Sequence, residues 1–394
     1  MYKQAKEMFA QIGIDTEAAI FALDSIPISL QCWQGDDVRG FENLDGYKGK
    51  NGTAIKNPGR AKNVEDLRKM LDKSLKLIPG AAKVTLHAMY GDVENISRAE
   101  IEPCHFKSWV DWARARGVGL NIYPTMFAHP NAASGLTLSH PEKGIREFWI
   151  EHVRRCRRIA AFFGLGLGQL SVMNLWIPDG YKDIPADQLT PRRRLEDSLD
   201  EIFHDYFDPT CIQDSVESTL FSPGAEGYMV GSYEFYFGYA LKNGLALCLD
   251  SGHFNPSDSV SSKIASVALY IPKILLHVAR PMRWDNNHVV LLDDELLSTT
   301  REITRHGLAD RVHIGLDYFD NSIDRVTAWA IGARNMRKAL LIALLEPYRM
   351  LQRAEEKFDF TQRLLIMEEI KTLPWQAVWD EYCERKDVPK RLRI

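Results

Sequence analysis

Acidic and histidine side chains recur at or near the ends of apolar, strand-like runs in this sequence. They are His87, Glu217, Asp250, His253, His277 and Asp317, with Asp285 in the polar segment 283–288. Carboxylates and imidazoles are costly to bury without a compensating charge, and a divalent cation supplies one. Oxygen-rich sites with one or two histidines suit Mn²⁺, Zn²⁺, Co²⁺ or Mg²⁺. The set exceeds what one ion needs, so the sequence predicts two metal sites.

Each of these residues also has an ordinary structural interpretation. Glu217 could be a carboxylate at a strand edge, and Asp250 or Asp317 could cap the helix that follows it. His277 lies in the apolar run Leu-Leu-His-Val, where a hydrogen-bonded core histidine is the more common case. The metal interpretation therefore depends on four successive strands presenting a ligand at the same end.

Aromatic side chains mark the ends of three other predicted strands. Trp33, Phe127 and Trp176 lie at or just after the ends of the first, third and fourth. Aromatic rings have a large apolar face that can pack against the C–H face of a sugar, although half of such residues simply belong to the core. These side chains, with His87, are our candidates for a sugar pocket.

The elements that must position these residues alternate along the chain. Eight strand-like runs are predicted near 28–33, 83–89, 118–123, 170–176, 213–219, 244–250, 274–280 and 311–317. Helical periodicity separates most of them, most clearly at 64–77, 104–116, 142–162 and 323–346. This pattern predicts a (β/α)8 barrel, with residues 1–394 forming a single domain with helical additions at both termini. A doubly wound open sheet is the alternative.

Two other segments are predicted to be structural. Gly164–Gly168 lacks the third glycine of a dinucleotide fingerprint, so it is interpreted as a helix cap and turn before a strand. The basic run Arg154–Arg158 alternates around a helix and predicts a solvated face. Neither the nucleophile motif G-x-S-x-G nor the zinc motif H-E-x-x-H occurs.

Composition limits the class of protein. Lysine and arginine number 49 and aspartate and glutamate 53, so the net charge of −4 gives no reason to expect a nucleic-acid partner. No apolar run approaches the length of about 20 residues that a membrane span needs. The six cysteines are scattered without C-x-x-C pairs, which favours free thiols in a cytoplasmic protein.

Long motifs in this sequence resemble those of bacterial L-rhamnose isomerases, over about residues 5–388. They include Gln31-Cys-Trp-Gln-Gly-Asp-Asp37, Asn174-Leu-Trp-Ile-Pro-Asp-Gly180, Cys248-Leu-Asp-Ser-Gly-His-Phe254 and His288-Val-Val-Leu-Leu-Asp-Asp294. The resemblance implies a (β/α)8 barrel, a cytoplasmic homotetramer, and interconversion of L-rhamnose and L-rhamnulose. It also implies two divalent cations, usually Mn²⁺, with Zn²⁺ or Co²⁺ as alternatives.

The resemblance assigns roles to individual positions. Glu217, Asp250, His277 and Asp317 match the ligands of a structural metal, and His253, Asp285 and Asn287 match those of a second, mobile metal. Trp33, His87 and Trp176 match positions that line the sugar pocket. We expect Asp285 to move the hydroxyl proton and His87 to assist ring opening.

This chain departs from the family pattern in the loop 45–62, at the C-terminus and at three places near the predicted site. Thr219 stands where the family has a lysine that stabilises charge near the carbonyl end of the sugar. Asn287 stands where the family has an aspartate, which leaves the second metal site weaker. Asn121-Ile-Tyr-Pro124 replaces the family's Asp-Phe-Asn-Pro.

Two functional hypotheses follow. The first is an aldose–ketose isomerase that works by a metal-assisted hydride shift. The second is a sugar- or metal-binding relative with little turnover, which the departures at positions 219 and 287 favour. A metal-dependent hydrolase or nuclease on the same barrel is disfavoured by the missing basic groove.

Overall fold

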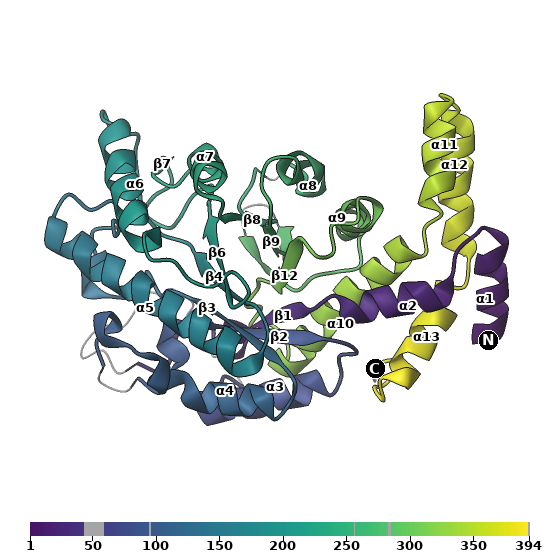
Figure 1. The fold of residues 1–394 in the computed structure, drawn as a ribbon, viewed down its shortest axis with the longest axis horizontal. Helices are drawn as coiled ribbons and strands as arrows, with labels where there is room; N and C mark the ends of the chain where they lie inside the picture. The colour runs from purple at the N-terminus through teal and green to yellow at the C-terminus, as the bar shows by residue number, and fades with distance from the viewer. Residues whose placement is uncertain (43–58, 94–95, 256, 283–284, 393–394) are drawn as a thin grey trace.

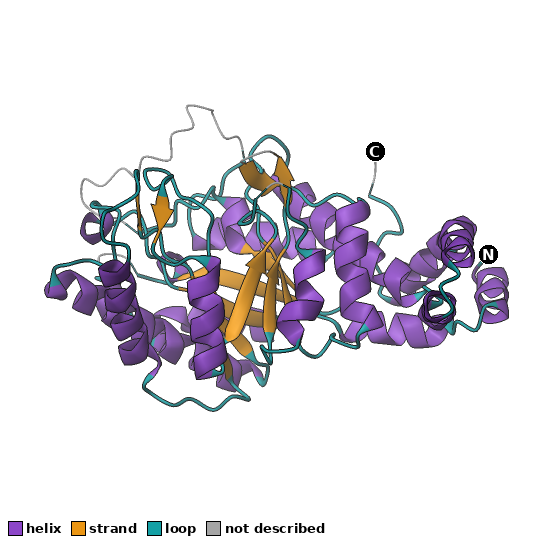
Figure 2. Cartoon of the chain, turned by 90° about the horizontal axis from the view of Figure 1, so that it is seen from above, coloured by secondary structure: helices purple, strands orange, loops and turns teal. Residues whose placement is uncertain are grey.

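Eight parallel strands close into a barrel at the centre of the protein (Figures 1 and 2). The computed structural model describes residues 1–42, 59–93, 96–255, 257–282 and 285–392. The strand order is β1-β12-β9-β8-β6-β4-β3-β2. Their bounds are β1 Ile28–Gln31, β2 Ala82–His87, β3 Gly119–Tyr123, β4 Ser171–Leu175, β6 Ile212–Glu217, β8 Ala246–Asp250, β9 Ile274–His277 and β12 Val312–Leu316. All eight predicted runs are barrel strands, so the predicted barrel is confirmed and the open sheet was the wrong alternative.

A helix follows each barrel strand and covers its outer face (Figure 1). These helices are α3 Val64–Leu75, α4 Lys107–Arg114, α5 Lys143–Leu167, α6 Leu189–Phe203, α7 Tyr233–Asn243, α8 Ser261–Ala268, α9 Asp294–Arg305 and α10 Arg325–Leu344. In α3, Leu67 and Leu71 are buried on one face, and the Asn63 side chain caps the first turn by accepting from the Asp66 N–H. Strands such as β3 and β8 are buried along their whole length, as expected for strands enclosed by helices.

Helices at the two ends of the chain gather on one side of the barrel, at the right of Figure 1. They are α1 Tyr2–Gln11, α2 Thr16–Ser25, α11 Tyr348–Glu356, α12 Phe360–Glu369 and α13 Trp375–Arg385. Helix α13 packs against α1, α2 and α10, which ties the two ends together. The predicted helical additions are therefore present. Among the described residues, no helix is both long and apolar enough to span a lipid bilayer.

Short elements decorate the loops between strands and helices. Two antiparallel pairs are formed by β5 (Gly180–Tyr181) with β7 (Tyr228–Met229) and by β10 (Arg280–Met282) with β11 (Asp285–His288). Single 3₁₀ turns are η1 Cys32–Gly35, η2 Ala88–Tyr90, η3 Arg98–Glu100, η4 Pro103–Phe106, η5 Pro130–Ala132 and η6 Ile370–Thr372. Most of them follow the carboxyl ends of barrel strands, where they shape the mouth of the barrel.

Helix α5 differs from the sequence-based expectation in two ways. Gly168 caps the helix in the left-handed conformation, with φ 64°, as predicted, but Gly164 lies inside the helix. A Cβ at Gly164 would lie 2.1 Å from the Cys211 carbonyl oxygen, so glycine permits close packing there. The basic run is not entirely solvated, because Arg157 is 3% exposed and pairs with Asp214 at 2.9 Å.

Replacing Gly164 with alanine should lower the free energy of unfolding by about 1–3 kcal/mol or more, because backbone rather than a flexible side chain must move. Gly144 in the same helix meets nothing within 4 Å, so Gly144→Ala should stabilise by about 0.5–1 kcal/mol. Urea titration of both variants checks the contrast. Equal stability of the two variants would contradict this account of the packing.

Candidate functional site

Four ionisable side chains from four successive barrel strands converge on one point at the carboxyl end of the barrel. His277, at the end of β9, lies at the centre. Its Nδ1 is 3.1 Å from an oxygen of Asp317, which follows β12, and 3.4 Å from oxygens of Glu217 on β6 and Asp250 on β8. This is the end at which parallel barrels place their functional residues. The predicted strand register therefore brings these four side chains together.

The chemistry of this cluster fits a divalent cation. Glu217, Asp250 and His277 are at most 3% exposed, and burial raises the pKa of the Asp250 carboxyl. His277 Nδ1 is buried and makes no hydrogen bond to the described residues. The four ligand atoms lie within 4.8 Å of one another. Carboxylate oxygens with one imidazole nitrogen are a donor set typical of Mn²⁺ or Zn²⁺.

Three further side chains join this cluster, and the sequence analysis did not name them as site residues. Tyr123, at the end of β3, places its hydroxyl 2.7 Å from His277 Nε2, which fixes the ring with Nδ1 facing the carboxylates. Asn174 donates from Nδ2 to Glu217 at 2.5 Å. Cys248 also borders Glu217 and His277, and burial keeps its pKa well above the usual range, so it remains a thiol. Tyr123 lies in a departure from the family pattern, and Asn174 and Cys248 open two of the motifs quoted for the resemblance, so each had a signal that was not interpreted.

His253 borders the same cluster from the loop after β8. Its Nδ1 lies 2.9 Å from Glu217 Oε1 and 3.1 Å from the Ser218 carbonyl oxygen. Burial lowers the pKa of His253, but the charges of Asp250 and Glu217 outweigh this and raise it to about 9. Glu217 therefore lies between His253 and His277. The backbones of Asp285 and Asn287 belong to β11, but their side chains lie outside the described part of the chain.

Aromatic rings form a continuous wall on the β1–β4 side of the same mouth. Ring centroids are 4.6 Å apart for Trp33 and His87, 5.4 Å for His87 and Phe127, and 6.3 Å for Phe127 and Trp176. Trp33 also donates from Nε1 to Asp317 at 2.9 Å, which joins the wall to the ionisable cluster. The four predicted pocket residues are therefore neighbours.

Two polar groups at this mouth have defined states. His87 donates from Nδ1 to the Pro124 carbonyl oxygen at 3.3 Å, so Nε2 carries a lone pair. Burial lowers the pKa of His87 to about 4, which keeps the ring neutral at physiological pH. Trp176 Nε1 is a buried donor without a hydrogen-bond partner among the described residues.

Thr219 follows the end of β6. It is buried, and its hydroxyl donates to the Phe221 carbonyl oxygen at 2.9 Å. The single proton of this hydroxyl is therefore engaged within its own loop. A threonine in this state has no second proton to offer to a ligand.

Asp250→Asn should stabilise the cation-free protein, because the amide removes one of three negative charges in a buried cluster. We expect a gain of about 0.5–2 kcal/mol in a chelator at neutral pH, together with loss of any stabilisation by added Mn²⁺. Denaturant unfolding with and without the cation checks both. Asp214→Asn is the control, because it strands Arg157 and should destabilise. A destabilised Asp250→Asn protein would contradict the repulsion.

Comparison with known proteins agrees with this geometry. Solved structures of a D-allulose 3-epimerase from Methylomonas sp. and of an L-ribulose 3-epimerase superpose with TM-scores of 0.51 each, at 9% and 11% identity. Each superposition covers 80% of this chain. It covers 98% of the D-allulose 3-epimerase and 95% of the L-ribulose 3-epimerase. At this identity they show the fold alone.

Sequence relatives carry more information. The proteins named L-rhamnose isomerase from Salmonella agona (strain SL483) and Salmonella typhimurium (strain LT2) are each 54% identical over 390 residues, covering 98% of this chain and 93% of theirs. The family model for L-rhamnose isomerase (RhaA) matches residues 1–393. The chain therefore belongs to the L-rhamnose isomerase family and is an isomerase.

Proposed function

We propose that this chain interconverts L-rhamnose and L-rhamnulose with the help of a divalent cation held by Glu217, Asp250, His277 and Asp317. The observation that carries the proposal is the convergence of three carboxylates on His277 Nδ1 beside an aromatic wall. The name of the 54% identical relatives supports the choice of substrate. When bound, the cation polarises neighbouring sugar oxygens and stabilises negative charge as it develops on them.

The reaction needs one hydrogen and one proton to change place. In the proposed hydride shift, hydrogen with its electron pair passes from C2 to C1 of the open-chain sugar, and the proton on O2 passes to O1. No nicotinamide is required, since the electron pair stays within the substrate. Asp285 is our candidate to carry the hydroxyl proton.

The aromatic wall is proposed to bind the sugar and to assist its ring opening. Trp33, Phe127 and Trp176 would cover its apolar face, and the unpartnered Trp176 Nε1 would donate to a hydroxyl oxygen. His87 is neutral, with its Nε2 lone pair available, so it can accept a hydroxyl proton during ring opening.

A second, weaker cation is proposed at His253, Asp285 and Asn287. Asp285 brings the only negative charge among these three, whereas the first site has three carboxylates, and cation affinity depends on that count. We propose Mn²⁺ as the cation, with Zn²⁺ or Co²⁺ as alternatives, and a homotetramer in the cytoplasm as the working form.

The direct test follows ketose formation from L-rhamnose after chelation and after Mn²⁺ is restored. Activity should disappear with the chelator and return with the cation. His277→Gln should abolish activity and tight cation binding. His313→Gln is a matched control, because His313 lies near the amino end of β12. This variant should retain both activity and tight cation binding. Activity that survives complete removal of metal would overturn the proposal.

A specific observation favours a slow enzyme as the second candidate. The Thr219 hydroxyl already donates to Phe221, so this position supplies no donor to the reacting sugar. Loss of one preorganised donor costs about 10²–10³ in rate. Under this alternative the chain binds the sugar well but converts it slowly.

Thr219→Lys together with Asn287→Asp should therefore raise kcat by up to about 10²–10³, with a smaller change in KM. The effects need not add, because both positions are assigned to the same substrate. Thr210→Lys adds the same charge at an exposed residue near the amino end of β6 and should leave kcat unchanged. If the unmodified chain is already as fast as the double variant, Thr219 is no handicap.

A further inference from the structure

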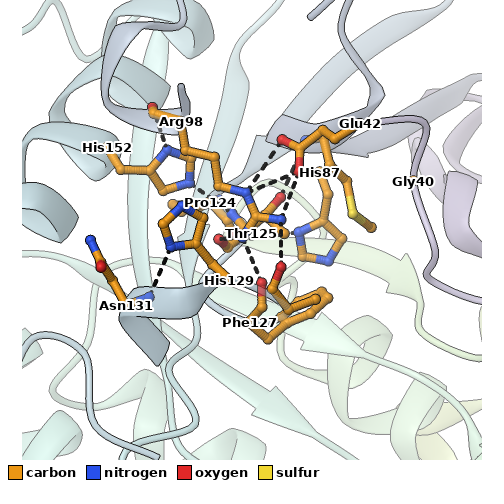
Figure 3. A network of polar contacts seen from close by, with 12 residues as sticks. Gly40, Glu42, His87, Arg98, Pro124, Thr125, Phe127, His129, Asn131 and His152 are labelled. Atoms are coloured by element: carbon orange, nitrogen blue, oxygen red, sulfur yellow. Dashed lines mark hydrogen bonds and ion pairs between the residues drawn. The ribbon is translucent and has the colours of Figure 1, made fainter. Parts of the chain in front are cut away.

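Arg98, the first residue of η3, is a buried cation close to the aromatic wall. Its side chain is 2% exposed, and its partner Glu42 is 6% exposed. The guanidinium contacts both oxygens of Glu42: Nη2 donates to Oε2 at 2.7 Å, and Nε lies 3.1 Å from Oε2 and 3.3 Å from Oε1 (Figure 3). A buried ion pair is weak evidence for stability, because desolvation offsets much of the attraction. Such a pair therefore calls for another explanation.

The other edge of this guanidinium holds the loop that follows β3. Nη1 donates to the carbonyl oxygens of Thr125 at 2.8 Å and Phe127 at 2.5 Å, and Nη2 lies 3.5 Å from that of Ala128 (Figure 3). Ala128 has φ 52°, in the left-handed region that a residue with a Cβ rarely adopts. Such a conformation persists only when its surroundings fix it, and Arg98 supplies that restraint.

His152, on α5, links the same loop to Arg98 a second time. Its Nε2 accepts from the Thr125 N–H at 3.0 Å, so Nδ1 must carry the proton that is donated to the Arg98 carbonyl oxygen at 2.9 Å. Burial lowers the pKa of His152 to about 3, so this neutral tautomer is kept throughout the physiological range. The loop is thus fixed at both its N–H and its carbonyl groups.

The loop held in this way carries part of the proposed sugar pocket. Phe127 stands with its ring edge-on to His87, at 87° and 5.4 Å, and edge-on to Trp176. The Pro124 carbonyl, at the start of the loop, orients His87. Arg98 makes none of these ring contacts, so its effect on the position of the Phe127 ring passes through the loop.

We propose that Arg98 is a positioning residue for the sugar site: it holds the loop 124–128 so that the Phe127 ring stands at the place where the pocket needs it. This inference rests on the proposed function. Under this proposal, the buried Arg98–Glu42 pair increases the affinity of the pocket for its sugar. The pair lies apart from the ionisable cluster, so cation affinity should not depend on it.

Binding of L-rhamnitol tests the proposal, because this open-chain alcohol cannot isomerise. We expect calorimetry with the Mn²⁺-loaded protein to give about tenfold weaker binding for Arg98→Lys, whose ammonium cannot bond to Glu42 and three carbonyls in one plane. The affinity for Mn²⁺ should stay within twofold of the unmodified protein. For L-rhamnose itself, KM should rise about tenfold while kcat changes less than threefold.

Coupling to Phe127 separates positioning from a general loss of structure. Phe127→Ala should also weaken L-rhamnitol binding about tenfold. If Arg98 acts through this ring, Arg98→Lys in the Phe127→Ala background should add no more than twofold. Glu42→Gln is a milder variant, which should weaken binding about threefold and show the same coupling, so the test does not depend on Arg98→Lys folding.

Arg157→Lys is the matched control. Arg157 is equally buried, pairs bidentately with Asp214 and donates to two carbonyl oxygens, but it lies near the amino end of β6. The Arg157→Lys variant should be less stable than the unmodified protein, but its affinity for L-rhamnitol should be unchanged. Additive effects of Arg98→Lys and Phe127→Ala, or equal behaviour of Arg98→Lys and Arg157→Lys, would overturn the inference. An unmodified protein that neither binds L-rhamnitol nor converts L-rhamnose would instead overturn the proposed function on which it rests.

Discussion

Mutual repulsion among three carboxylates, two of them buried and that of Asp317 partly exposed, is the constraint around which the barrel mouth is built. Glu217, Asp250 and Asp317 come from separate strands, and closure of the barrel forces their oxygens toward His277. In a region of low dielectric such charges stay together only if a positive charge lies between them. Protonated imidazoles can supply that charge, and a divalent cation supplies more of it in less space. The fold therefore maintains a cluster of carboxylate and imidazole ligands that fits a divalent cation.

The aromatic half of the mouth is organised by a different principle. His87 ends β2 and Trp33 lies in η1, whereas Phe127 and Trp176 lie on loops, which must be held through their backbone groups. Here side chains bond directly to those groups: Arg98 and His152 hold the loop after β3, and His87 bonds to its first carbonyl. The Trp33 Nε1–Asp317 hydrogen bond then couples this half to the ionisable half.

Two side-chain contacts at the mouth were not anticipated by the sequence analysis. Tyr123 bonds to the outer nitrogen of His277, the kind of contact that orients a histidine and raises its basicity as a ligand. Thr219 turns its hydroxyl back to its own loop. The first contact orients a member of the ionisable cluster, whereas the second engages the only hydroxyl proton of Thr219.

The sequence by itself determined the order of strands and helices and the end of the barrel at which the ionisable residues lie. These depend on local periodicity and on residue types at strand ends, which neighbouring residues reveal. It could not place Arg98 or Arg157, because the solvation of a guanidinium depends on a partner 56 or 57 residues away. It could not place Tyr123, whose partner His277 is 154 residues away. Only barrel closure brings such groups together, and the tertiary structure therefore decided which charges are buried, which histidine tautomers exist and how the predicted rings stand against one another.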